Sequence, residues 1–207
     1  AYFMNSLGAY KVDRRKKNLP YLETLNMYSG LAIEKGAHSL FFPGGTRSRS
    51  GTIEKMLKLG LLSTATEAQR NIYLKTPAGE EPRKIFVVPV TLNYHFVLEA
   101  PELIDDYLSV KGQDRYLPEE DKYGSLQLIQ FLFKFFTKGS NISVSIGRGL
   151  DIMGNYVDEE GNSLDAQGRI IDTRDYFISN GQLTIDKQRE DEYTRMLSQR
   201  IVAEYHK

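Results

Sequence analysis

The sequence predicts an α/β fold with a mostly parallel central sheet flanked by helices. Strand-like segments alternate with helix-like segments through residue 147, and this alternation is typical of βαβ units. The most strand-like run is 85–94 (IFVVPVTLNY), which is rich in β-branched and aromatic residues. A chain of 207 residues is also long enough to bury a substantial core in one domain.

The first part of the chain supplies two expected strands and two expected helices. Residues 9–12 have strand character, and residues 20–34 are expected to form a helix that ends at Gly36. Residues 39–42 form an apolar run typical of a buried strand. Residues 53–74 have the pattern of a long helix.

The second part begins with strand 85–94, whose Pro89 should lie at an edge, a bulge or a strand end. The elements expected after it are a short helix (102–110), an apolar helix (126–138), a strand (141–147), a polar hairpin or excursion (158–172) and a charged C-terminal helix (185–206). No internal repeat is evident. We expect one domain over residues 1–150, and take 151–207 as a polar excursion with a C-terminal helix, either in the same domain or as an appendage.

Composition excludes several classes of function. Lys plus Arg and Asp plus Glu each number 27, so the chain lacks the basic excess of a general nucleic-acid binder, and no nucleic-acid partner is expected. There are no cysteines, which excludes disulfides and thiolate metal sites. The three histidines show no metal-ligand spacing, so no metal is expected either.

No stretch reaches the roughly 20 apolar residues that a membrane-spanning helix needs. The most apolar run is 126–136 (LQLIQFLFKFF), which is shorter and contains Lys134. This run is interpreted either as a core helix or as a segment that lies in the bilayer interface.

The segment with the clearest chemical meaning is 41–51 (FFPGGTRSRSG). Its glycines allow a ligand to approach the backbone, its hydroxyls donate hydrogen bonds, and Arg47 and Arg49 offer planar forks that match a phosphate. A following helix with Thr52 as N-cap would point its positive end at the same place. We therefore expect a phosphate-bearing substrate here; the alternative is a solvated loop without a ligand.

Three segments together resemble those of a known family. They are 8–14 (GAYKVDR), 42–48 (FPGGTRS) and 88–90 (VPV), in this order along the chain. As a set they resemble the second, third and fourth motif blocks of the glycerolipid acyltransferases, the superfamily of glycerol-3-phosphate and 1-acylglycerol-3-phosphate (lysophosphatidate) acyltransferases. The resemblance covers roughly residues 5–150, and the longer ending 47–51 (RSRSG) favours the glycerol-3-phosphate branch.

The resemblance implies a glycerol-3-phosphate acyltransferase-like fold and a role in phospholipid biosynthesis. The enzyme would move a fatty acyl group from acyl-CoA or acyl-ACP, as co-substrate and without a further cofactor, to glycerol-3-phosphate. It would work at a membrane surface on the cytoplasmic side. By resemblance, Arg14 and Arg47 would clamp the phosphate of the acceptor, and the remaining expected substrate-binding residues are Gly44, Gly45, Thr46, Ser48 and Arg49.

The chain departs from the family pattern at two points. It contains no H-x-x-x-x-D block, which in the family holds the catalytic base and precedes the second block. We therefore expect that block to lie before Ala1 in an acyltransferase domain truncated at its N-terminus, so the catalytic residues are not assigned. Gly44 stands where the family has glutamate. Two alternatives follow: lysophosphatidate as the acceptor, or a non-catalytic phospholipid-binding module of the same fold.

Overall fold

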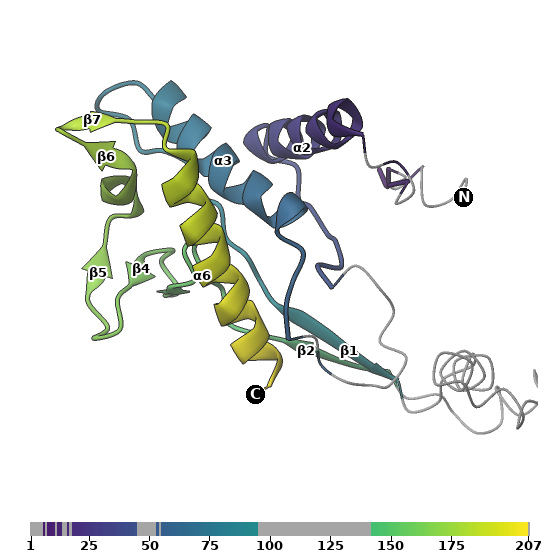
Figure 1. Ribbon diagram of the computed structural model, residues 1–207. Coiled ribbons are helices and arrows are strands. Elements are labelled where there is room, and N and C mark those ends of the chain that lie inside the picture. The colour runs from purple at the N-terminus through teal and green to yellow at the C-terminus, as the bar shows by residue number, and fades with distance from the viewer. Residues whose placement is uncertain are drawn as a thin grey trace, which may run out of the picture.

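The computed structural model describes residues 6, 8–10, 12–13, 16, 18–44, 53, 55–94 and 142–206 (Figure 1). Its long helices are α2 (Leu19–Glu34), α3 (Leu59–Lys75) and α6 (Lys187–Tyr205). Helix α3 packs against α2 and also against α6, so it lies between them, as Figure 1 shows. The described strands are short and lie around this group of helices.

Helix α2 confirms the helix expected over residues 20–34. Pro20 occupies its first turn, where the missing N–H has no intrahelical partner to lose. The helix ends at Glu34 with Lys35 as its C-cap, and the next residue, Gly36, has a φ of +92° that stops the helix. The small residues Ser29 and Gly30 are buried and allow close approach to α3, where Ser29 Oγ lies 3.4 Å from Thr64 Oγ1.

Helix α3 begins later than the sequence predicts. Its first residue is Leu59 and its N-cap is Lys58, so the expected start at residue 53 is wrong and Gly60 lies in the first turn. The reason is tertiary, because Leu57 is buried in the core and the Lys58 N–H donates to the carbonyl of Pro43 at 2.8 Å. These contacts hold the preceding residues outside the helix.

Two hydrophobic clusters fill the space between α3, α6 and the segments beside them. The first contains Leu57, Leu62, Leu150, Leu197 and Ile201. The second contains Ala65, Tyr73, Ile152, Met153 and Phe177. Because α6 contributes to the first and flanks the second, the C-terminal helix shares one core with the N-terminal half of the chain.

The described strands pair antiparallel, which differs from the expected parallel sheet. Strand β1 (Val90–Tyr94) pairs with β2 (Ile142–Ile146), with Val90 opposite Ile146. The α/β class holds, but the parallel central sheet is not found among the described residues. The expected strand 39–42 has no strand assignment, and neither do the described residues of 9–12. An apolar run defines a strand only when a neighbouring strand pairs with it.

Strand β1 is shorter than the predicted run 85–94, because its continuous pairing with β2 begins at Val90, directly after Pro89. Pro89 therefore precedes the strand, as expected for a residue without an N–H, and its carbonyl accepts a hydrogen bond from Gly147 N–H at 2.8 Å. Upstream, Val87 forms an isolated antiparallel bridge with Leu150. Strand β2 confirms the strand expected over 141–147.

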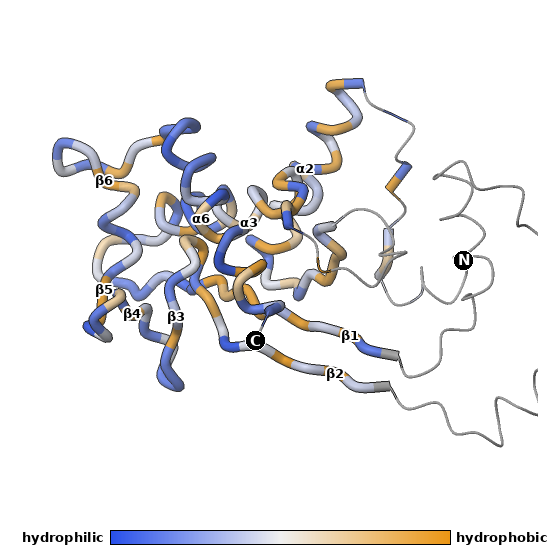
Figure 2. Tube along the Cα trace, turned by 60° about the horizontal axis from the view of Figure 1, so that its bottom comes forward, coloured by the Kyte–Doolittle hydropathy of each residue, from blue (hydrophilic) through white to orange (hydrophobic). Residues whose placement is uncertain are grey.

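The ribbon formed by β1 and β2 is amphipathic and extends away from the helices (Figure 2). Apolar residues alternate with polar ones along both strands, and their exposed fractions reach 73% at Ile146 and 54% at Val144. Opposite them in β1 lie Val90 and Leu92, which are 39% and 42% exposed. One apolar face of this ribbon is therefore largely uncovered by the described residues.

The expected polar excursion at 158–172 is a three-stranded meander. It consists of β3 (Tyr156–Val157), β4 (Ser163–Leu164) and β5 (Ile170–Ile171), each antiparallel to the next. The meander contains an internal repeat that we did not expect, since the pattern Asp-x-x-Gly-Asn/Arg recurs every seven residues. The repeated aspartates are Asp151, Asp158 and Asp165, and the repeated glycines are Gly154, Gly161 and Gly168.

Each repeat of the meander forms the same tight turn. The aspartate N–H donates to the carbonyl of the residue four positions later, and the glycine N–H donates back to the aspartate carbonyl, as at Asp165 and Gly168 with distances of 2.9 and 3.0 Å. All three glycines have φ between +79° and +89°. A residue with a side chain would be strained at these positions, so glycine is favoured there. Because such a turn recurs every seven residues, it limits the length of the strands between the turns.

The remaining elements connect the meander to the last helix. They are the short 3-10 helix η2 (Thr173–Phe177), β6 (Ile178–Ser179) and β7 (Gln182–Leu183). Asn180 and Gly181 both have positive φ and close the β6–β7 hairpin, as in a type I′ turn. Helix α6 confirms the helix expected over 185–206. The helices expected over 102–110 and 126–138 lie outside the described residues.

Candidate active site

The stems of the predicted phosphate-binding loop are fixed in the core. We define them as 41–44 before the loop and 57–59 after it. Phe41 and Leu59 pack against the first hydrophobic cluster, of which Leu57 is a buried member. The Lys58 N–H donates to the Pro43 carbonyl at 2.8 Å. The chain therefore leaves the core and returns to it at the same place, with a backbone hydrogen bond closing the base of the loop.

The returning stem leads directly into the N-terminus of α3. The N-cap Lys58 makes no side-chain capping hydrogen bond, and the first turn carries no acidic residue. The first N–H groups of any α-helix have no intrahelical partner, and these groups and the positive end of the helix dipole attract anions. The helix starts six residues later than predicted, yet its positive end still lies at the base of the loop. Anion binding at this place stays a prediction.

The structure describes only one of the predicted substrate-binding residues. Gly44 is partly buried and follows Pro43 in a turn at the end of the first stem. The others lie outside the described residues: Arg14, Gly45, Thr46, Arg47, Ser48 and Arg49. Thr52, the expected N-cap, lies outside them as well, and Lys58 takes the capping position of α3.

The segment before Arg14 is held against α2. The Asp13 N–H donates to the hydroxyl of Tyr21 at 2.8 Å, and the rings of Tyr10 and Tyr28 meet edge to face with centroids 5.2 Å apart. Two points of α2 therefore anchor the block that ends at Arg14. Since α2 also packs against α3, this block is tied to the helix that follows the loop.

Three apolar side chains in or next to the stems face solvent. Leu40 is 85% exposed, Phe42 76% and Met56 84%. These three residues, which we call the apolar rim, lie within a stem or directly beside one in the sequence. Exposed aliphatic and aromatic side chains gathered at a binding site are typical of a surface that meets another apolar phase or partner.

No catalytic base is identified among the described residues. His38 is exposed at the end of the turn after α2, and His206 follows the C-terminus of α6. His95 lies outside the described range. No group of three His, Asp or Glu side chains in the described part of the chain could hold a metal ion. Within the same part, no helix is both long enough and apolar enough to cross a bilayer.

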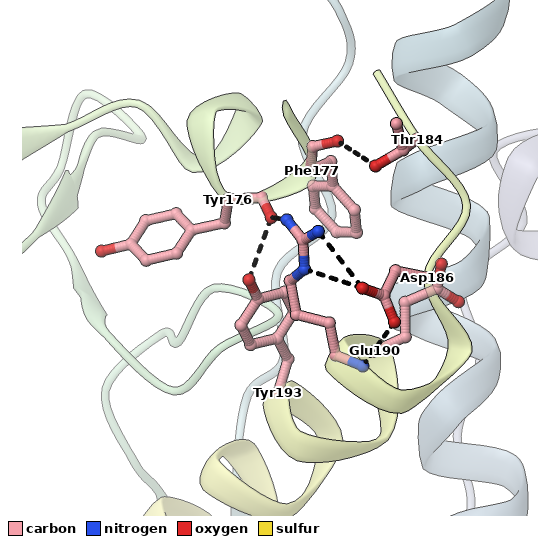
Figure 3. A pocket seen from close by; sticks show the side chains of 7 residues that line it. Tyr176, Phe177, Thr184, Asp186, Glu190 and Tyr193 are labelled. Atoms are coloured by element: carbon pink, nitrogen blue, oxygen red, sulfur yellow. Dashed lines mark hydrogen bonds and ion pairs between the residues drawn. The ribbon is translucent and has the colours of Figure 1, made fainter. Parts of the chain in front are cut away.

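A depression elsewhere on the surface carries no ligand chemistry (Figure 3). It lies between η2 and the N-terminal end of α6, with Tyr176, Phe177 and Tyr193 in its wall. The guanidinium of Arg189 reaches the carbonyl of Tyr176 at 3.2 Å and the carboxylate of Asp186 at 3.2 Å. The N–H groups of the Arg189 guanidinium are thus used to join η2 to the start of α6. This end of α6 is distant from the end that packs near the loop stems.

Sequence reasoning missed the contribution of α6 to the candidate site. Its apolar residues Leu197, Ile201 and Tyr205 lie four residues apart and so share one face. Leu197 and Ile201 are buried in the cluster that holds the loop stems, and Tyr205 packs against it. The spacing was visible in the sequence, but the partner of this face depends on the fold.

Comparison with known proteins supports the interpretation of the N-terminal half. Residues 1–93 match the model of a family described as Acyltransferase. The matched range contains all three segments on which the resemblance rests, and the resemblance is confirmed there. No curated protein and no solved structure gave a significant match to the chain.

Proposed function

We propose that this chain, whose residues 1–93 match the Acyltransferase family, binds the acceptor in an O-acyltransferase that acylates glycerol-3-phosphate. The family match supports acyltransferase activity in general terms. The observation that supports a phosphate-bearing acceptor is the closed base of the loop. There, the Pro43–Lys58 hydrogen bond joins the two stems beside the N-terminus of α3, and the arginine-rich sequence lies between these stems along the chain.

The reaction transfers an acyl group from sulfur to oxygen. A hydroxyl of the acceptor attacks the thioester carbonyl of acyl-CoA or acyl-ACP, a C–O bond forms, and the C–S bond breaks to release the thiol. A base must take the hydroxyl proton, and that group is not among the described residues. The role of this chain is to hold the acceptor phosphate with Arg47 and Arg14, so that the hydroxyl stays oriented for attack.

The phosphate clamp is tested with Arg47→Ala in the full-length protein. Losing one charged contact to phosphate costs about 1.5–3 kcal/mol, so kcat/KM for glycerol-3-phosphate should fall roughly 10- to 100-fold. Arg195→Ala is the matched control, because Arg195 is an exposed arginine of α6 that pairs with the equally exposed Glu192 on the same helix. Equal kcat/KM in the Arg47 variant and the wild type would rule out the clamp.

The identity of the acceptor is tested by comparing the turnover of two candidate substrates. Turnover of glycerol-3-phosphate above that of 1-acylglycerol-3-phosphate supports our assignment. The reverse preference supports a lysophosphatidate acyltransferase, and the change of glutamate to Gly44 in the loop makes this comparison necessary.

Membrane attachment is part of the proposal, on the cytoplasmic side. The apolar rim would insert into the bilayer interface, where acylated products partition. Phe42→Asn should weaken sedimentation with vesicles that contain anionic lipid. The control is Ile170→Asn on β5, which is 67% exposed but lies on the opposite side of the helices from the stems (Figure 1). Equal sedimentation of the two variants would contradict this role of the rim.

The second candidate function is a phospholipid-binding module without catalysis. It is favoured by Gly44, which stands where the family's third block has glutamate. Vesicle binding by the full-length protein without acyl transfer would support the module, whereas turnover would exclude it.

A further inference from the structure

We infer that the last turns of α6 position the stems of the phosphate-binding loop, and that Tyr205 is a positioning residue for the acceptor site. This inference rests on the proposed function of the loop. It goes beyond the family match, which ends at residue 93, because α6 lies wholly outside the matched range.

The contacts that carry the inference lie in the first hydrophobic cluster. From the loop stems come Leu57, which is 7% exposed, and the partly buried Phe41 and Leu59. From α6 come Leu197 and Ile201, which are 0% and 3% exposed. Both stems therefore share one apolar contact region with the C-terminal helix.

Val202 and Tyr205 extend this contact toward the end of α6. Both are partly buried and pack against the cluster that contains Leu57. A tyrosine ring supplies a large apolar area, so Tyr205 covers part of the cluster to which both stems contribute. Its ring is the last large side chain of the helix before His206.

The direction of α6 explains why its end reaches the loop. At its start, Glu190 pairs with Arg70 of α3, and Thr194 Oγ1 lies 3.3 Å from Thr66 Oγ1. Further along, Ile201 shares the first cluster with Leu62. The two helices thus run in opposite senses, and the C-terminal end of α6 lies beside the N-terminal end of α3, where the loop closes.

The chemical consequence is preorganisation. The Pro43–Lys58 hydrogen bond sets the separation of the stems, but a single bond at the base of a loop does not fix the orientation of the chain that leaves it. Apolar packing of both stems against one rigid helix fixes this orientation. Acceptor binding is weakened when loop residues must be ordered during binding, so loss of this packing should raise KM for the acceptor more than it lowers kcat.

The test compares Tyr205→Ala with Tyr193→Ala in the full-length protein. Tyr193 is the same residue type on the same helix and is also partly buried, but it packs against the second cluster. We expect Tyr205→Ala to raise KM for glycerol-3-phosphate roughly tenfold, with kcat changed less than threefold, because small misplacements of substrate-positioning groups have effects of this order or larger. Tyr193→Ala should leave KM within about twofold of the wild type.

A second measurement does not depend on turnover. Arg47, Arg49 and Lys55 are trypsin sites in the sequence between the two stems, so the rate of cleavage after them measures how firmly the packed stems are held. Cleavage should be several-fold faster in Tyr205→Ala than in Tyr193→Ala, and glycerol-3-phosphate should slow it in the wild type. If Tyr205→Ala fails to fold, Val202→Ala removes a smaller part of the same packing and replaces it in both measurements.

The outcomes separate this inference from the proposed function. Equal KM values and equal cleavage rates for the Tyr205 and Tyr193 variants would overturn the role of α6, whatever the substrate. If the variants differ in loop cleavage as expected but the wild type neither binds nor acylates glycerol-3-phosphate, α6 does position the loop and the acceptor assignment is wrong.

Discussion

Arg70 of α3 and Glu190 of α6 form a buried ion pair. Nη1 of Arg70 lies 2.5 and 2.6 Å from the two carboxylate oxygens of Glu190, and the side chains are only 8% and 5% exposed. The pair also connects to α2, because Arg70 donates to the side-chain oxygen of Asn71, whose amide donates to Glu34. One polar network therefore joins the three long helices of the described residues.

Breaking this pair on one side should destabilise the fold strongly. Arg70→Met leaves the Glu190 carboxylate buried without its partner, and we expect a loss of about 3–5 kcal/mol in the free energy of unfolding. The double variant Arg70→Met, Glu190→Leu should recover most of this loss. Chemical denaturation measures both.

The control for the buried pair is Lys187→Met. Its Nζ pairs with Glu67, and the two side chains are 63% and 36% exposed, so the expected loss is about 1 kcal/mol or less. A cost for Arg70→Met no larger than that of this surface variant would show that the pair is solvated in solution.

The repeated turns allow a matched comparison of two glycines. Gly154 and Gly168 occupy the same turn position with φ of +89° and +79°. A Cβ at Gly154 would lie 3.0 Å from Cβ of Arg200 and 3.2 Å from Cα of Leu197, whereas one at Gly168 would meet no atom within 4 Å. Only the first turn lies tightly against α6.

Gly168→Ala should therefore cost about 1–2 kcal/mol, from backbone strain alone. Gly154→Ala should cost about 1–3 kcal/mol more, because the α6 backbone must shift to admit the methyl group. Thermal unfolding of both variants measures the difference, and equal melting temperatures would mean that the meander does not contact α6 at Gly154.

Stability should depend on Tyr73 at alkaline pH. Burial raises the pKa of Tyr73 to about 12, although the hydrogen bond with Thr173 opposes the shift. In the unfolded chain the phenol ionises near its ordinary pKa of about 10. The stabilisation that comes from the protonated Tyr73 phenol is therefore complete below pH 10. As the pH rises from 10 toward 12, the free energy of unfolding falls by up to roughly 1 kcal/mol per pH unit.

The variant Tyr73→Phe isolates this effect. The difference in the free energy of unfolding between wild type and variant should stay constant below pH 10 and shift against the wild type above it. Denaturation at pH 9, 10 and 11 tests this, and a difference that stays constant across the whole range would contradict the raised pKa.

The turn aspartates should titrate at low pH. The Arg169 N–H donates to the carboxylate of Asp165 at 2.8 Å, and this backbone hydrogen bond is the main cause that lowers the pKa of Asp165 below its ordinary value. The same holds for Asp158 and Asn162. The two ionised carboxylates therefore stabilise the fold at any pH above the ordinary aspartate pKa. This stabilisation is lost as the pH falls from the ordinary pKa through the lowered pKa of the folded protein.

Carbon NMR of the carboxyl groups measures these pKa values directly. We expect titration midpoints for Asp158 and Asp165 below that of an aspartate in an unstructured peptide. Asp165→Asn, which keeps one acceptor oxygen, should lose the low-pH dependence of stability at that turn. Midpoints at the ordinary value would mean that the turns open in solution.

Local signals were sufficient for much of the fold. Pro20 and Gly36 delimit α2, β-branched residues give the strand Ile142–Ile146, and the charged periodic pattern after residue 185 gives α6. Capping, φ preference and period depend on neighbours within a few residues. The same local chemistry predicts that 41–51 binds an anion, and this stays a prediction because residues 45–52 lie outside the described part of the chain.

Tertiary contacts decided the remainder. The start of α3 moved to Leu59 because Leu57 is buried and Lys58 bonds Pro43, and helix propensity between residues 53 and 58 cannot reveal either contact. The apolar run 39–42 became a stem without strand pairing, since pairing needs a neighbour that sequence periodicity does not name. The contact between α6 and the loop stems joins residues more than 140 positions apart. The apolar face of a helix can be read from its spacing, but the surface that it covers is set by the packing of the whole chain.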